Sequence, residues 1–67
     1  MKPKRWWIKE RHNPQLGVYY LGMGQLSDRA AKAAEKTAYG FNVMLSYDSE
    51  EEYTKMIRVL NGEKENQ

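Results

Sequence analysis

Apolar and polar residues alternate in two segments of the chain, 5–11 and 41–47, and each alternation predicts a strand. Residues 18–23 are rich in strand-forming residues and also predict a strand, separated from the first by residues 12–17, a stretch rich in turn-forming residues. We therefore expect these two strands to pair as an antiparallel hairpin. Residues 41–47 show the clearest alternation, with Phe41, Val43, Leu45 and Tyr47 on one side. They predict a third strand.

Two other segments carry helix signals. Ser27 is a favourable N-cap for a helix over residues 28–38, which contain five alanines. Ser49 and Glu52 form a capping box at the start of a second helix. Apolar residues of this second helix recur at helical spacing, at Tyr53, Met56, Ile57 and Leu60, and Gly62 ends it.

The predicted order of elements is ββαβα. We expect an α+β fold with a three-stranded sheet and two helices packed on one face. Residues 1–62 form a single compact domain in this interpretation, and residues 63–67 form a frayed polar tail.

Composition narrows the class of protein. The chain has 67 residues, of which 30% are charged and 40% hydrophobic, and it has no cysteine. It has no apolar run long enough for a membrane span or a signal peptide. We expect a soluble, cytoplasmic and complete chain with no membrane partner and no disulfide.

Charge is unevenly distributed. Residues 1–12 carry five basic side chains and one acidic side chain, whereas residues 48–67 carry six acidic and three basic ones. The net charge is only +2. Such a dipole favours docking with the basic end against an anionic surface, although it is also compatible with ordinary solubilising charge.

If both helices cover one face of the sheet, the opposite face stays open. Placing Trp6 and Ile8 in the core sends their strand neighbours to that open face. The predicted partner-binding residues on it are Arg5, Trp7, Lys9, Arg11, Tyr20 and Met44. A slip of one residue in the first strand would exchange Trp7 for Trp6.

An aromatic patch with a basic rim fits several kinds of partner. Its aromatic residues could anchor a host protein, or they could stack on the bases of DNA or RNA while the cations bind phosphates. A third possibility is a homodimer that pairs its open faces. The principal expectation is a small non-enzymatic binding protein that inhibits or regulates a host protein.

Catalytic and ligand motifs are not evident. His12 lies in the predicted turn without a nucleophile placed near it by any motif. Residues 50–52 are three glutamates in a first helical turn, where the helix dipole favours carboxylates. Residues 22–24 (Gly-Met-Gly) lack the rest of a phosphate loop. We expect no enzyme activity, no cofactor and no metal.

Residues 7–20, together with 39–42 and 52–53, resemble small uncharacterised accessory proteins encoded by phages and prophages. This resemblance implies a compact accessory protein that is either a small regulator or an inhibitor of a host defence or metabolic enzyme, with an anti-CRISPR-like role as one case. Residues 49–53 (Ser-Glu-Glu-Glu-Tyr) after a basic aromatic hairpin also resemble the arm-type DNA-binding domains of phage integrases. The helix expected over 28–38 departs from that second pattern. Neither resemblance assigns a functional residue.

Overall fold

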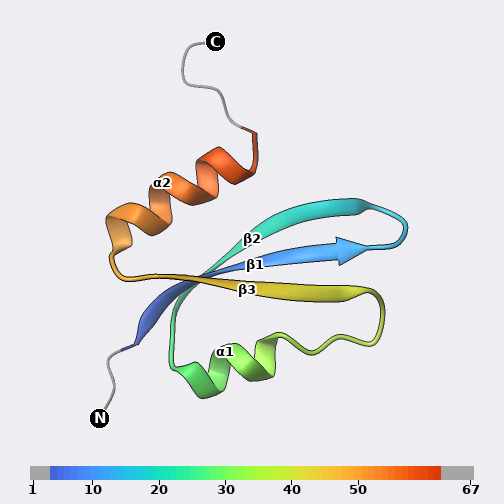
Figure 1. The fold of residues 1–67 in the computed structure, drawn as a ribbon, viewed down its shortest axis with the longest axis horizontal. Helices are drawn as coiled ribbons and strands as arrows, with labels where there is room; N and C mark the ends of the chain where they lie inside the picture. The colour runs from blue at the N-terminus through green and yellow to red at the C-terminus, as the bar shows by residue number, and fades with distance from the viewer. Residues whose placement is uncertain (1–3, 63–67) are drawn as a thin grey trace.

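The computed structural model describes residues 4–62, and the predicted tail at 63–67 lies outside the described residues. The elements follow the predicted order: β1 (Arg5–Asn13), β2 (Gly17–Leu26), α1 (Asp28–Ala34), β3 (Phe41–Tyr47) and α2 (Glu50–Leu60) (Figure 1). The α+β class, the three-stranded sheet and the two helices are therefore confirmed. Neither helix in the described part is long and apolar enough to cross a membrane.

β1 is the central strand of the sheet, in the order β2-β1-β3. It pairs antiparallel with both neighbours, so Glu10 lies between Tyr20 on one side and Val43 on the other. The register with β2 shifts between Trp7 and Ile8, which leaves Met23 as a bulge on β2. Pairing between β1 and β3 runs from Trp6 to His12 without a shift.

The two helices lie on opposite faces of the sheet, and here the expectation of one shared face is wrong. Trp6 packs on Tyr53 of α2, with ring centroids 5.2 Å apart. Trp7 points the other way, because neighbouring residues of a strand face opposite sides, and it lines a hollow with Ala31 and Lys32 of α1. Figure 1 shows α2 and α1 on opposite sides of the strands.

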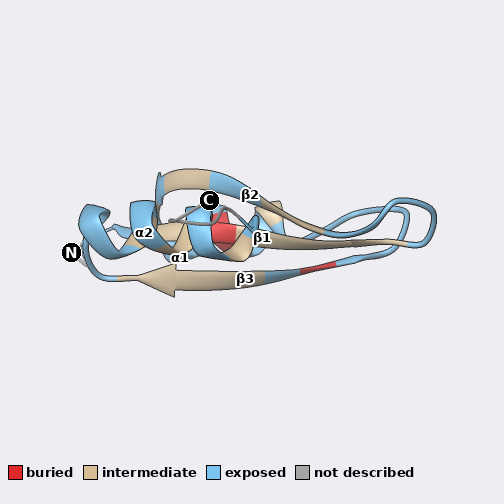
Figure 2. Ribbon diagram, turned by 90° about the horizontal axis from the view of Figure 1, so that it is seen from above, coloured by how far each residue is buried: buried red, intermediate tan, exposed pale blue. Residues whose placement is uncertain are grey.

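We name the two faces by their helices. The α2 face carries Trp6, Ile8, Glu10 and His12 of β1, and the α1 face carries Arg5, Trp7, Lys9 and Arg11. Both helices gather at one end of the strands, so the opposite end extends beyond them without a helix on either face (Figures 1 and 2).

Very few side chains are buried in residues 4–62. Ile8 is fully buried, Ala31 is nearly so, and Asn42 is a buried polar residue. Gly22 lies opposite Ile8, and a β-carbon there would collide with the hydroxyl of Tyr53. The missing side chain therefore lets α2 approach the sheet closely.

Helix α1 is shorter than predicted, because tertiary bonds hold the chain after it. Glu35 is the C-cap, and its carbonyl accepts a hydrogen bond of 2.9 Å from Nδ2 of Asn42. The carbonyl of Tyr39 accepts another from the guanidinium of Arg11. Both N-caps are as predicted, since Ser27 Oγ accepts from the Ala30 amide and Ser49 Oγ from the Glu52 amide.

Ile8→Ala should lower the free energy of unfolding by about 2–5 kcal/mol, because it removes the one large side chain that is fully buried among residues 4–62. Urea denaturation followed by circular dichroism measures this loss. The control is Val59→Ala on the exposed side of α2, which should change stability by less than about 0.5 kcal/mol. Equal losses in the two variants would contradict this account of the core.

Candidate binding surface

The structure separates the residues that were predicted to form one patch. Arg5, Trp7, Lys9, Arg11 and Met44 share the α1 face, whereas Tyr20 lies on the α2 face opposite Glu10. The predicted grouping of Tyr20 with Trp7 is therefore wrong. The turn explains the error, because pairing of Asn13 with Gly17 sets the register that places Tyr20 beside Glu10.

Helix α1 covers the part of its face where Trp7 and Met44 lie. Both residues are half-buried and line a hollow of about 320 Å³ between β3 and the helix. The indole Nε1 of Trp7 donates a hydrogen bond of 3.0 Å to the Leu26 carbonyl. Trp7 therefore packs within the domain and does not form an open stacking platform.

The cations of this face are also engaged within the chain. Arg5 forms an ion pair of 2.9 Å with Asp48. The guanidinium of Arg11 donates to the carbonyls of His12 at 3.2 Å, Phe41 at 3.4 Å, and Tyr39. Lys9 is half-buried and has no ion pair within residues 4–62. Two of the three predicted steering cations thus have structural partners.

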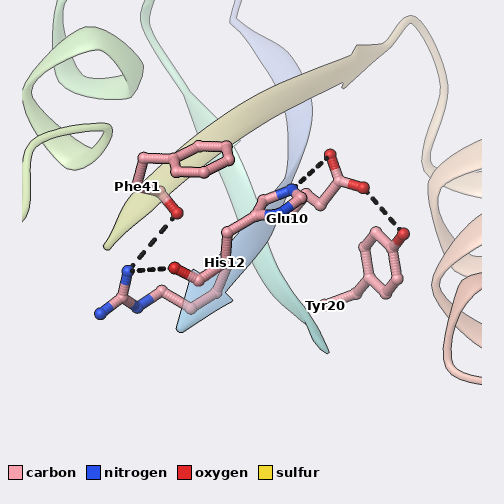
Figure 3. A network of polar contacts seen from close by, with 5 residues as sticks. Glu10, His12, Tyr20 and Phe41 are labelled. Carbon is pink, nitrogen blue, oxygen red and sulfur yellow. Dashed lines mark hydrogen bonds and ion pairs between the residues drawn. The ribbon is translucent and has the colours of Figure 1, made fainter. Parts of the chain in front are cut away.

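A polar network crosses the α2 face beyond the helix itself (Figure 3). The hydroxyl of Tyr20 donates to Oε2 of Glu10 at 2.8 Å, and Nε2 of His12 lies 3.3 Å from Oε1 of the same carboxylate. The hydrogen bond from Tyr20 and the nearby imidazole lower the pKa of Glu10, and this bond also raises the pKa of Tyr20. The network fixes the orientation of His12.

His12 in turn supports an exposed apolar ring. Its imidazole stacks on Phe41, with centroids 4.2 Å apart and planes inclined by 10°. Phe41 and Val18 are opposite His12 on its two neighbouring strands. The three side chains, together with Pro14, line a hollow of about 200 Å³ at the end of the sheet.

We call the exposed apolar residues at this end the distal surface: Leu16, Val18, Tyr39 and Phe41. Leu16 is 74% exposed, and Val18, Tyr39 and Phe41 are 52%, 49% and 56% exposed. Leu16 comes from the turn after β1, Val18 from β2, Tyr39 from the loop before β3, and Phe41 from the start of β3. No helix covers this end of the sheet (Figure 2).

Local backbone bonds give the distal surface a fixed shape. Oδ1 of Asn13 accepts hydrogen bonds of 2.8 Å from the amides of Gln15 and Leu16, as the turn signal predicted. Gly40 has a φ of +82°, and a β-carbon there would collide with the carbonyl oxygen of His12. The β1–β2 turn and the loop before β3 are therefore held against each other.

The sequence interpretation missed most of this surface. It placed Phe41 on the same side of the third strand as Val43 and Leu45 without recognising it as exposed, and it treated residues 12–17 only as a turn. The available signal was Leu16, a large apolar residue inside an otherwise polar turn. Such a residue is a candidate contact because nothing in a short turn buries it.

Comparisons with known proteins add no relative: no family model, no curated protein and no solved structure matches the chain. Within residues 4–62 no group of three or more His, Asp or Glu side chains could hold a metal ion.

Tyr20→Phe should raise the pKa of Glu10 toward its ordinary value, because the variant removes the hydrogen bond that contributes most to the shift. A carboxyl group whose pKa is lower in the folded than in the unfolded protein stabilises the fold at pH values above its unfolded pKa. This contribution to the free energy of unfolding is lost as the pH falls through the folded pKa. The wild type should therefore lose more stability than the variant on acidification below the ordinary carboxyl range. NMR titration of Glu10 and urea denaturation at neutral and acid pH measure both effects.

Gly40→Ala should destabilise the domain by about 1–3 kcal/mol, because it forces a side chain into the left-handed region and against the His12 carbonyl. Gly62 is a matched control, with a φ of +79° and open space around it. Gly62→Ala carries only the backbone penalty, so it should lower stability less than Gly40→Ala in thermal unfolding. An equal loss of stability in the two variants would contradict the close packing at Gly40.

Proposed function

We propose that the protein is a non-catalytic binding module that occupies a surface of another protein in the host cell through its distal surface. The observation that carries the proposal is that Val18 and Phe41 line a hollow at an end of the sheet that no helix covers, and that Leu16 and Tyr39 are exposed in the two loops at the same end. Exposed apolar clusters of this kind are typical of protein–protein contacts.

The chemistry of the distal surface fits the centre of a protein interface. Aromatic residues are enriched at such centres, and a shallow hollow accepts one apolar side chain of the partner. Two charged groups near it, Glu10 and Arg11, already form hydrogen bonds within the domain. A partner at the distal surface would therefore bury mainly apolar atoms.

The alternative, DNA or RNA binding through the basic aromatic face, has less support. It requires exposed aromatic rings and free cations, whereas Trp7 is packed under α1 and Arg5 and Arg11 have partners in the domain. The role in regulating or inhibiting a host protein, including an anti-defence role, is the consequence that we propose for binding at the distal surface.

Leu16→Glu and Val18→Glu should each weaken partner binding by at least about tenfold, because each places a charge in the apolar contact. The partner is first captured from host lysate with the wild-type protein and identified by mass spectrometry. Its affinity for each variant is then measured with purified proteins by calorimetry. Val59→Glu, at an equally exposed valine on α2, is the matched control and should bind like the wild type.

Salt dependence separates the two candidate functions. Binding through the distal surface should change little with salt, whereas phosphate contacts give a steep linear fall of log affinity with log salt. Binding to nucleic acid that shows this fall and is lost in Lys9→Ala, with Leu16→Glu unaffected, would overturn the proposal.

A further inference from the structure

The distribution of charge across the sheet is the reverse of the usual one. The central strand β1 carries Arg5, Lys9, Glu10 and Arg11, whereas β2 and β3, the two edge strands, carry no charged residue at all. Edge strands normally carry charges or prolines, because their unpaired backbone groups otherwise pair with other chains. Two uncharged edges lack this protection, so each edge strand is a candidate for pairing with another chain.

The edge of β2 is interrupted, and the edge of β3 is not. Met23 bulges out of β2, and the Gly24 amide in the same strand donates to the Tyr53 hydroxyl at 3.1 Å. Bulges are one of the devices that prevent edge pairing. In contrast, β3 is regular from Phe41 to Tyr47 and pairs on one side only, with β1. Figure 2 shows it along one margin of the molecule.

We propose that β3 pairs with β3 of a second copy of this chain, antiparallel and centred on Met44, to give a continuous six-stranded sheet. Met44 is the midpoint of the strand, so residues at equal distances from it lie opposite each other. The pairing forms roughly six to eight backbone hydrogen bonds. A two-fold axis perpendicular to the sheet keeps each α2 on one common face and each α1 on the other.

The side chains of β3 match in this register. On the α2 face Val43 lies opposite Leu45 of the second copy, and Phe41 lies opposite Tyr47 of the second copy. On the α1 face Met44 meets Met44, and Asn42 lies opposite Ser46. Apolar residues thus lie opposite apolar residues, and polar Asn42 lies opposite polar Ser46. Matched cross-strand pairs of this kind stabilise antiparallel sheets.

The size of the core points in the same direction. A domain of 67 residues has little apolar area to bury, and here Ile8 is the one large side chain fully buried within the described residues. Domains of this size commonly gain stability from oligomerisation. Pairing at β3 would also cover Val43, which is 36% exposed in one chain.

Val43→Glu should raise the dissociation constant of the dimer by at least about tenfold, because it places a carboxylate opposite Leu45 and within about 7–8 Å of its own counterpart. Sedimentation equilibrium over about a thousandfold range of protein concentration measures the constant, since dimer formation follows mass action. The matched control is Val18→Glu, which makes the same change on the same face of the other edge strand. It should remain dimeric although it loses the partner bound at the distal surface.

A disulfide tests the register. The chain has no cysteine, so Met44→Cys introduces a single thiol that lies directly opposite itself in the proposed pair, at a Cβ separation of about 4.5–5.5 Å. Oxidation should convert this variant to a covalent dimer. Val43→Cys is the control, because its thiol faces Leu45 and lies too far from its counterpart to bridge.

Three results would overturn the inference. The first is a wild-type protein that stays monomeric at every concentration. The second is a dimer that Val18→Glu dissociates and Val43→Glu leaves intact. The third is equal cross-linking of Met44→Cys and Val43→Cys. Loss of partner binding in Leu16→Glu with the dimer intact would leave this inference standing, so failure of the proposed function and failure of the dimer are distinguishable.

Discussion

The fold depends on the alternation of two adjacent tryptophans along the central strand. Trp6 and Trp7 must point to opposite faces of β1, where Trp6 packs on Tyr53 of α2 and Trp7 lines a hollow with Ala31 and Lys32 of α1. Because both helices are held at this one place, they gather at one end of the strands. The rest of the sheet extends beyond them and receives no cover from its own chain. The distal surface exists because the two aromatic anchors are next to each other.

The charges of β1 follow from the same arrangement. A central strand has neighbours on both sides, so side chains of both edge strands and of the loops beyond them lie within reach of its charged groups. Glu10 is bonded by Tyr20 of β2, Arg5 pairs with Asp48 after β3, and Arg11 holds the loop before β3. These bonds do not make an ionic recognition site. They fix the two loops and the strand ends around the apolar distal surface.

Much of the local structure could be predicted from the sequence, because its signals are local. Ser27 and Ser49 cap the helices, and Asn13 organises the turn, as their chemistry indicates. The faces could not be predicted, since helical periodicity does not say which side of a sheet a helix crosses. Tyr20 was placed wrongly because Tyr19, Tyr20 and Leu21 are all apolar, so either phase of alternation was acceptable. Only the pairing of Asn13 with Gly17 decides between them.

The bulge at Met23 has a consequence for how far an assembly of this chain can grow. If two sheets join through β3, the strands left at the outer margins are both β2. There the irregular backbone offers no continuous template for a further chain. Assembly through the regular edge would therefore stop at a closed pair, whereas a chain with two regular edges would polymerise into fibrils.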